Sequence, residues 1–409
     1  MLEHLPLIVF LVTFVLIFVL RMPIPAGMIA ACTLYFLTDG LIKGVGFGAL
    51  ITGAGGFIGK NLLATLRVQG FCDLMLFEKD DTPETLAQYA ARAGFVFHLA
   101  GINRPKDPSE FYSGNSGLTD VLLDLLAKAE KPAPVLVTSS TQAALDNDYG
   151  KSKAMAEAAV YAYGEKTGAP VYVFRLPGVF GKWCRPNYNS VVATFCHNAA
   201  HGLPLEVRDP AYSLPLVYID DVVRAFIAAM DGNVVTDGEC PAHCRVEPEH
   251  VTTLGHLAQV IGGFAENRKT LEAPYLAAGS LEKKLYSTWL SYLPTDSFSY
   301  PLNMHCDARG SFTEFLRTPE RGQVSVNISK PGIVKGNHWH NSKNEKFLVV
   351  SGRGVIRFRK PDEETVYEYF VSGDKLEVVD IPTGYTHNIE NLGEGDMVTL
   401  MLSLIHISE

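Results

Sequence analysis

A glycine-rich turn constrains this chain more than any other feature of its sequence. Residues 52–59 read T-G-A-G-G-F-I-G, directly after a short apolar run at 49–52 and before a helical pattern at 61–68. The first glycine permits a tight turn, the second lets the backbone approach a pyrophosphate, and the third lets the helix pack closely on a strand. The pyrophosphate would bind the free N–H groups at the start of that helix. The pattern predicts a dinucleotide site that consists of Gly53, Gly56, Phe57, Ile58 and Gly59.

Strands and helices are predicted to alternate after this turn. Apolar runs typical of buried strands lie at 49–52, 73–77, 94–99 and 135–139, and the segments between them have helical character, at 61–68, 82–92 and 115–128. This alternation is typical of a parallel, doubly wound sheet with helices on both faces. The predicted fold class of this part is therefore α/β, of the Rossmann type.

The end of the second predicted strand carries the residues that would select the cofactor. Glu78 stands 19 residues after Gly59, where an acidic residue usually binds the ribose 2′-hydroxyl of NAD. Lys79 follows and could instead meet the 2′-phosphate of NADP. Leu99 and Ala100, at the end of the third predicted strand, are assigned to the same cofactor site. These residues alone leave the choice between NADH and NADPH open.

A serine, a tyrosine and a lysine form the candidate catalytic set. S-S-T at 139–141 ends the fourth predicted strand, and Y-G-K-S-K follows at 149–153. Tyr149 and Lys153 are four residues apart and project from one face of a helix. A nearby ammonium favours the phenolate and so lowers the pKa of a tyrosine, which is otherwise a poor acid at neutral pH. With Ser140 as a second donor to a carbonyl oxygen, this set predicts hydride transfer coupled to proton delivery.

These motifs together resemble the extended short-chain dehydrogenase/reductase family. Further pieces that match are H-L-A-G at 98–101, R-L-P-G-V-F-G at 175–181 and V-Y-I-D-D-V at 217–222. The resemblance implies Tyr149 as the acid, Lys153 as its partner and Ser140 as the carbonyl donor, although the gap between the serine and the tyrosine is shorter than in most sugar-modifying members. Members of this branch act on nucleotide-linked sugars, and the positions where they seat the sugar correspond to Arg185, Asn187, Tyr188 and Asn189. A plain loop role is the alternative for these four residues.

The last third of the chain changes to short strands separated by Gly and Pro. The predicted strands lie at 323–329, 346–350, 354–359, 365–371, 375–381 and 397–402. Such spacing is typical of a small all-β barrel or sandwich. His338 and His340, two apart on a strand, would point the same way, while Glu345 and His387 would arrive from other strands. Three imidazoles and a carboxylate can hold a divalent metal with one position open to a ligand.

The spacing of these four residues resembles the two motifs of the cupin family. The resemblance implies a cupin barrel with His338, His340, Glu345 and His387 as metal ligands, zinc being favoured; a cupin that binds no metal is the alternative. D-A-R-G-S-F-T-E at 307–314 also resembles the strand that cupin-type nucleotide-sugar epimerases place near their substrate. Arg309 in this strand would suit bidentate binding of a phosphate, and a structural turn is the alternative role.

A reductase followed by a cupin resembles the family of bifunctional capsular-polysaccharide enzymes. The resemblance covers residues 48–402 and implies two steps on a UDP-linked amino-deoxy sugar. The cupin would invert carbon 3 of a UDP-2-acetamido-2,6-dideoxy-4-hexulose, and the reductase would reduce the 4-ketone with NADPH to the L-talose form. A homodimer is also predicted. The seven scattered cysteines argue against a disulfide scaffold and favour a reducing cytoplasm. Two rivals are a reductase whose cupin only dimerises the chain, and a sugar-nucleotide sensor without catalysis.

Both ends of the chain differ in character from its middle. The predicted domains are an apolar leader at 1–43, the reductase at 44–299 and the cupin at 300–409. The leader has uncharged runs at 5–20 and 22–37 and is either a membrane segment or a foreign fusion. L-S-L-I-H-I-S-E at 402–409 resembles translated sequencing adapter, so the cupin is expected to be truncated and open at one edge. A net charge of −9 without a basic block argues against a nucleic-acid partner.

Overall fold

The structure is a computed structural model of the whole chain. It describes residues 9, 11–13, 48–103, 105, 107, 111–238, 240–274, 276–318 and 322–404. The described chain forms two compact units, one made of the residues up to Phe195 with Val207–Leu257, the other of Cys196–Glu206 with the residues after Ala258. Each unit contains one of the two predicted candidate sites.

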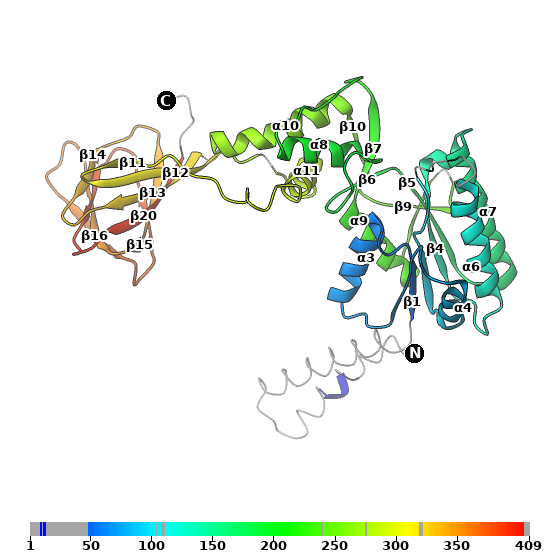
Figure 1. Ribbon diagram of the computed structural model, residues 1–409. Coiled ribbons are helices and arrows are strands. Elements are labelled where there is room, and N and C mark those ends of the chain that lie inside the picture. Colours follow the sequence, from blue (N-terminus) through cyan, green and yellow to red (C-terminus); the bar gives the residue numbers. More distant parts are fainter. Residues whose placement is uncertain are drawn as a thin grey trace. The chain divides into compact units, whose positions relative to one another are not determined.

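The first unit is built on a seven-stranded sheet (Figure 1). Its strands are β1 (Ala49–Thr52), β2 (Leu74–Phe77), β3 (Phe95–His98), β4 (Val135–Ser140), β5 (Val171–Leu176), β8 (Val235–Thr236) and β9 (His243–Arg245). They lie in the order β2-β1-β3-β4-β5-β9-β8, and every neighbouring pair is parallel except β8 with β9. The predicted parallel α/β sheet is confirmed, and its first four strands lie within one residue of the predicted bounds.

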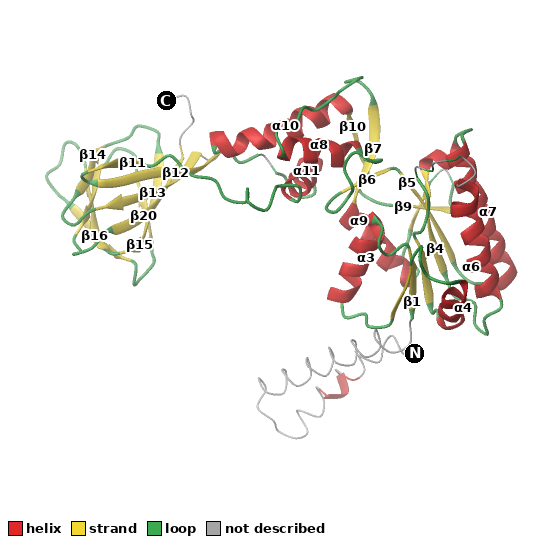
Figure 2. Cartoon of the chain, viewed as in Figure 1, coloured by secondary structure: helices red, strands yellow, loops and turns green. Residues whose placement is uncertain are grey.

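Helices cover both faces of this sheet (Figure 2). Those of the first unit are α3 (Phe57–Val68), α4 (Pro83–Arg92), α6 (Leu118–Ala127), α7 (Asp148–Thr167) and α9 (Ile219–Met230), with short π and 3₁₀ turns η2 (Tyr112–Gly117) and η3 (Thr141–Ala144). Apolar residues of α3 and α9, such as Leu62 and Phe226, form one core with the sheet. Leu86, Leu122 and Val160, from α4, α6 and α7, form the second core on the other face. The central strands are buried on both sides, as two helical layers require.

The strand order places the switch point of the sheet between β1 and β3. The chain leaves β1 toward β2 on one side and reaches β3 on the other, so the helices that follow these two strands diverge. Ligands of doubly wound sheets bind at the carboxyl ends of strands at such a point. The glycine turn follows β1 at Gly53, and Leu99 follows β3, so both predicted cofactor segments lie at this position.

Among the described residues, a small three-stranded sheet and three more helices complete the middle of the chain. The sheet has the order β10-β7-β6, with β6 (Gly178–Phe180), β7 (Ser213–Tyr218) and β10 (His250–Thr253). β6 is parallel to β7, and β10 is antiparallel to it. The helices outside the large sheet are α8 (Val191–Ala200), α10 (Leu254–Thr270) and α11 (Leu281–Leu290). The last two fall within 251–293, a stretch whose sequence predicts helical structure.

The second unit contains two antiparallel β-sheets, as the predicted all-β fold requires. One has the order β11-β12-β13-β20-β15-β18 and the other β14-β19-β16-β17. The strands are β11 (His305–Asp307), β12 (Gly310–Thr318), β13 (Gly322–Ser329), β14 (Val334–His338), β15 (Asn344–Ser351), β16 (Arg353–Arg359), β17 (Tyr367–Ser372), β18 (Val378–Ile381), β19 (Thr386–Asn391) and β20 (Met397–Leu404). Phe347 of the first sheet and Ile356 and Ile389 of the second share one buried core.

The C-terminal strand lies inside its sheet, which contradicts the open edge expected there, while the truncation of the cupin stays a prediction. β20 continues through Leu404 and is paired on both sides, with β13 and with β15. Ser403 lies opposite Gln323 and Glu345, so the adapter-like stretch begins inside a central strand rather than at an open edge. Residues 405–409 lie outside the described residues.

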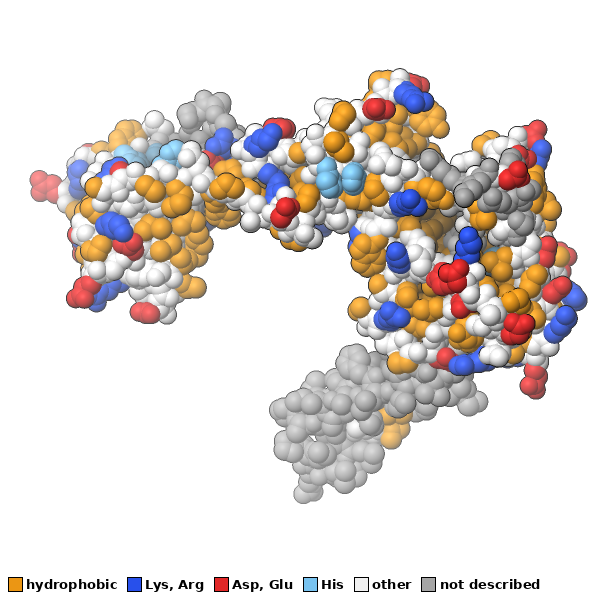
Figure 3. All heavy atoms as spheres, viewed as in Figure 1, with side chains coloured by type: hydrophobic (Ala, Val, Ile, Leu, Met, Phe, Trp, Pro, Cys, Tyr) orange, Lys and Arg blue, Asp and Glu red, His pale blue; other side chains and the backbone are white. Residues whose placement is uncertain are grey.

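The predicted membrane leader at 1–43 lies almost wholly outside the described residues. In the part of the chain that the structure describes, no helix has the length and hydropathy of a membrane span. On the face drawn in Figure 3, Lys and Arg side chains are interspersed with Asp and Glu.

Candidate active sites

The glycine turn has the geometry of a dinucleotide cradle. Gly53 has φ +71°, and a Cβ there would lie 2.8 Å from the backbone nitrogen of Ala100. A Cβ at Gly59 would lie 2.4 Å from the Gly53 carbonyl oxygen. Both positions therefore require glycine. α3 begins after Gly56 without a side-chain cap, which leaves the first N–H groups of the helix for an anion.

Glu78 reaches the glycine turn from the end of β2. Its carboxylate accepts a hydrogen bond from the Gly55 N–H. The side chain thus lies beside the turn, where an acidic residue can bind a ribose hydroxyl. Lys79, by contrast, is exposed. The cradle and this carboxylate fit the adenosine half of a nicotinamide dinucleotide.

Tyr149 and Lys153 lie on one face of α7, beside the end of β4. The helix begins at Asp148, and the Asn147 side chain caps it by accepting from Gly150 N at 2.7 Å. The Lys153 ammonium donates to the Thr138 carbonyl at 3.1 Å and lies 6.0 Å from the Tyr149 ring centroid. The predicted set is therefore brought together at the end of β4.

The pKa of Tyr149 differs from the value expected from the sequence, which predicts a lowered pKa. Burial raises the pKa of Tyr149, and a hydrogen bond with Ser140 lowers it only in part. The expected lowering by Lys153 is absent from the described contacts, because that ammonium is directed at the Thr138 carbonyl. Burial also lowers the pKa of Lys153 to about 8, against the raising effect of Glu157.

The predicted sugar-binding residues lie on the loop between β6 and α8. The Arg185 guanidinium lies 5.4 Å from the centroid of the Tyr188 ring. Asn187 has φ +54°, and its N–H donates to the Thr194 hydroxyl at 3.0 Å. Arg185, Asn187 and Asn189 are exposed. The loop has a defined conformation, and its role in binding stays a prediction.

In the second unit, a backbone irregularity directs His338 toward His387. The two residues are paired across β14 and β19, and the register shifts between Gly336 and His338. Gly336 has φ +106°, and a Cβ there would lie 2.8 Å from the His387 carbonyl oxygen. β14 ends at His338, so His340 lies beyond the strand. The prediction that both histidines share one strand is wrong for His340, because the chain turns there.

The four predicted metal ligands nevertheless converge. One ligand atom from each of His338, His340, Glu345 and His387 lies within 4.8 Å of all the others. Glu345 Oε2 is 3.2 Å from His340 Nε2 and 3.5 Å from His387 Nε2. Glu345 and His387 are buried, whereas His338 is exposed, so the cluster opens to one side.

The protonation states of the cluster suit a cation. Burial lowers the pKa of both His338 and His340, in the first case with help from the neighbouring imidazoles. Burial would raise the pKa of Glu345, but hydrogen bonds from His387, Lys343 and Ser403 outweigh it and the net shift is downward. Neutral imidazoles and an ionised carboxylate are the forms that bind a metal. Within the described residues, the buried Nδ1 of His387 has no hydrogen-bond partner. This donor set fits one divalent ion.

Arg309 lines the same cavity as three of the clustered residues, His338, Glu345 and His387. The cavity has a volume of about 340 Å³, and its walls also include Lys335 and Lys343. Asp307 holds the guanidinium, with Arg309 Nη2 at 2.6 Å from Asp307 Oδ2. The cavity therefore combines a candidate metal centre with several cations, an arrangement suited to an anionic ligand.

Comparisons with known proteins match both units. Residues 49–239 match the NAD dependent epimerase/dehydratase family, and residues 305–405 match the polysaccharide biosynthesis C-terminal domain. A UDP-2-acetamido-2,6-beta-L-arabino-hexul-4-ose reductase from Pseudomonas aeruginosa is 44% identical over 352 residues, 86% of this chain and 93% of the relative. The crystal structure of the capsular polysaccharide assembling protein CapF from Staphylococcus aureus is 49% identical, with a TM-score of 0.83, over 88% of this chain and 96% of that one. This chain belongs to the CapF family.

A shorter relative also matches. The spore coat polysaccharide biosynthesis protein SpsL from Bacillus subtilis is 31% identical over 103 residues, 23% of this chain and 68% of the relative. The two family matches of this CapF-family chain coincide with its two candidate sites. Ser140, Tyr149 and Lys153 lie in the first matched stretch, and the four clustered metal-ligand candidates lie in the second.

Several polar residues around Lys153 were not predicted from the sequence. Asn115 Nδ2 donates to Ser152 Oγ at 3.0 Å, and its Oδ1 accepts from Ile102 N at 2.8 Å. A Cβ on Gly101 would lie 3.1 Å from Lys153 Nζ and 2.9 Å from Asn115 Oδ1. These contacts fix the loop after β3 against α7. Their signal in the sequence is weak, because the partners are 13 and 37 residues apart.

Proposed function

We propose that this chain carries two active sites that act in turn on one UDP-linked amino-deoxy sugar. The antiparallel unit, a cupin, epimerises carbon 3 of a UDP-2-acetamido-2,6-dideoxy-4-hexulose. The Rossmann-type unit then reduces the 4-ketone with NADPH to the L-talose form. The observation that carries the proposal is the juxtaposition of Tyr149 and Lys153 on α7 in a chain 44% identical to a UDP-sugar 4-ketose reductase.

In the reductase site, Tyr149 gives its phenolic proton to the oxygen of the 4-ketone. Ser140 donates a second hydrogen bond to the same oxygen and holds the ketone against the phenol. NADPH, held by Gly53, Gly56, Gly59, Glu78 and the start of α3, supplies the hydride when it is bound. Lys153, whose ammonium lies 6.0 Å from the centroid of the Tyr149 ring, would hold the ribose of the bound cofactor. The loop of Arg185 and Tyr188 contacts the nucleotide sugar.

In the cupin site, the 4-ketone acidifies the hydrogen on carbon 3. A divalent metal, with zinc favoured, would be held by His338, His340, Glu345 and His387 and would supply Lewis-acid polarisation of the carbonyl. Arg309, oriented by Asp307, binds the diphosphate of the substrate in the adjoining cavity. The predicted homodimer and cytoplasmic location stay predictions.

The role of Arg309 can be tested by substitution. Arg309→Gln removes the charge and the bidentate fork, so the KM for epimerisation is expected to rise about tenfold or more, on the order of the loss of one charge-assisted contact. Reduction of an already epimerised ketone should keep its KM, because Arg309 belongs to the other unit. The measurement is the initial rate of exchange at carbon 3 against substrate concentration. An unchanged KM would assign Arg309 to the structural turn.

The proposed function is tested by supplying UDP-2-acetamido-2,6-dideoxy-4-hexulose with NADPH and, in parallel, with NADH. We expect stoichiometric oxidation of NADPH and a reduced sugar nucleotide identified by mass spectrometry and NMR. Binding of the sugar nucleotide without turnover would favour a sensor and overturn the proposal. Removal of metal by a chelator should stop epimerisation only; unchanged epimerisation would reduce the cupin to a structural or dimerising role.

A further inference from the structure

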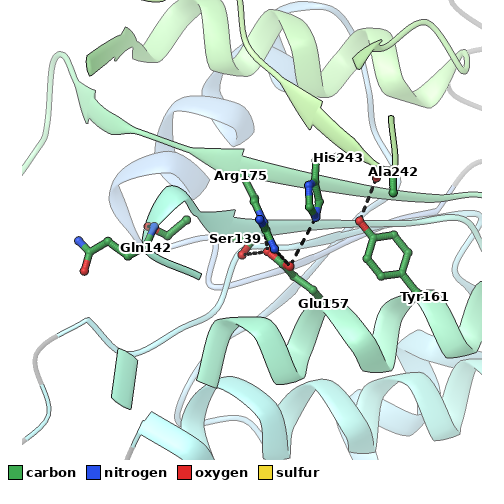
Figure 4. Close-up of polar contacts among 8 residues, drawn as sticks. Ser139, Gln142, Glu157, Tyr161, Arg175, Ala242 and His243 are labelled. Carbon is green, nitrogen blue, oxygen red and sulfur yellow. Dashed lines mark hydrogen bonds and ion pairs between the residues drawn. The ribbon is translucent and has the colours of Figure 1, made fainter. Parts of the chain in front are cut away.

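A buried glutamate lies behind the reductase site and is not used by the chemistry described above. Glu157 is only 4% exposed and projects from α7 toward three parallel strands (Figure 4). Arg175 of β5 binds it through two donors, Nε to Oε1 at 2.9 Å and Nη2 to Oε2 at 2.6 Å. The Ser139 hydroxyl of β4 donates to Oε1, and His243 Nε2 of β9 lies 3.6 Å from Oε2. One carboxylate therefore connects α7 to β4, β5 and β9.

Burial of a carboxylate in this way lowers the stability of the fold unless all of its polar contacts are kept. The charge loses its hydration, and only partners with suitable geometry compensate for that loss. Arg175 supplies a bidentate ion pair, which fixes the direction of the carboxylate plane as well as its charge. A buried carboxylate at this position therefore needs more contacts of exact geometry than a buried apolar side chain would need. Fold stability alone does not account for it.

The residues that contact Glu157 are neighbours, along α7 and β4, of the proposed catalytic residues. Tyr149, Lys153 and Glu157 are spaced by four residues along α7, so they follow one face of the helix. Ser139, which binds Glu157, directly precedes Ser140, which bonds to Tyr149. The carbonyl of Thr138, the residue before, accepts from the Lys153 ammonium. Three successive residues at the end of β4 thus contact Lys153, Glu157 and Tyr149 in turn.

We propose that Glu157 is a positioning residue of the reductase site, which fixes the end of β4 against α7 and thereby sets the places of Ser140 and Lys153. The inference deepens the proposed function and rests on it. Loss of the carboxylate frees Ser139 and the guanidinium of Arg175 together. The donor pair around the substrate oxygen then loses its fixed spacing, and misplacement of such groups by even about 1 Å slows chemistry severely.

The charge of Glu157 also acts on Lys153. The negative charge of Glu157 raises the pKa of Lys153, whereas burial lowers it by more. The net result of the two effects is a pKa of about 8. The titratable groups that face Lys153 are Tyr149 and Glu157 of α7 and His98 of β3, and burial keeps His98 neutral with a pKa of about 3. Glu157 itself faces Arg175, His243 and Tyr161. Without the carboxylate, Lys153 should lose its proton at a lower pH.

The test compares Glu157→Gln with the wild type and with Glu165→Gln. Glu165 is an exposed glutamate on the same helix, so its substitution removes the same charge without the buried contacts. We expect Glu157→Gln to lower kcat for reduction by roughly tenfold or more. KM should change little, and the alkaline limb of the kcat profile should move to lower pH. Epimerisation should be unchanged, and Glu165→Gln should match the wild type.

A lower unfolding temperature with wild-type kcat and an unchanged pH profile would overturn the inference and leave Glu157 a purely structural residue. If Glu157→Gln does not fold, Ser139→Ala is the substitution that tests the proposal. It removes one hydrogen bond to Glu157 and leaves the ion pair between Glu157 and Arg175 intact. Its kcat should then fall several-fold with the alkaline limb in place, and wild-type kcat would contradict the proposal. Failure of the proposed function itself is distinguishable, because the wild type and Glu165→Gln would then not reduce the ketone either.

Discussion

Replacement of Tyr149 by phenylalanine is expected to lower reduction of the 4-ketone by about a hundredfold or more, the usual contribution of a positioned general acid. The ring keeps its packing on Phe111, whose centroid lies 5.6 Å away, so only the proton donor is lost. Epimerisation at carbon 3 should continue, because its site belongs to the other unit. The measurement is NADPH oxidation in single-turnover and steady-state experiments. Lys153→Met should behave similarly and should also weaken cofactor binding.

The matched control for this substitution is Tyr163→Phe. Tyr163 lies on the same helix, is buried, and donates to the Ala133 carbonyl at 2.7 Å. Its loss is expected to cost about 1 kcal/mol of stability, the usual net value of one hydrogen bond, with no effect on kcat. Oxidation of NADPH at the wild-type rate by Tyr149→Phe would show that another group protonates the ketone.

His340→Ala is expected to abolish epimerisation and to lower the metal content well below one ion per chain. The substitution removes one of four donors from a cluster that is already open on the side of His338. Glu345 would lose its 3.2 Å contact with His340 and would keep those with Lys343 and Ser403. Metal analysis and solvent deuterium wash-in at carbon 3 give the two readouts. Reduction of an epimerised ketone should survive.

His201→Ala is the control for this loss. His201 is an exposed histidine outside the cluster, so its substitution should leave metal content and wash-in unchanged. Equal deuterium incorporation in His340→Ala and in the wild type would refute the metal mechanism. A wild-type protein without bound metal that still exchanges deuterium would refute it equally.

The parts of the fold that depend on local patterns could be predicted from the sequence. Alternating strands and helices are encoded in neighbouring residues, and β1, β2, β3 and β4 all lie close to their predicted bounds. The glycine turn is predictable from its local motif, although only Gly59 is fixed by neighbours in the sequence, because Gly53 is fixed by its contact with Ala100 after β3. α3 begins four residues earlier than the predicted helix, since the glycines before it already adopt the turn that starts it.

Features that depend on long-range geometry could not be predicted. The bulge at Gly336 and the turn that takes His340 off the strand need the partner strand β19. The direction of the Lys153 ammonium depends on the carbonyl of Thr138, which follows from how α7 packs on β4. Glu157 shows the same limit. Its spacing from Lys153 is visible in the sequence, but Arg175 and His243 reach it from strands 18 and 86 residues further on.

The central claim is that one chain first inverts carbon 3 and then reduces carbon 4. The most direct test is a single reaction of the UDP-4-hexulose with NADPH in deuterium oxide, followed by NMR of the product. The account predicts a reduced sugar with the inverted configuration and deuterium at carbon 3, and with hydrogen from NADPH at carbon 4. A product reduced at carbon 4 that carries neither inversion nor deuterium at carbon 3 would contradict it.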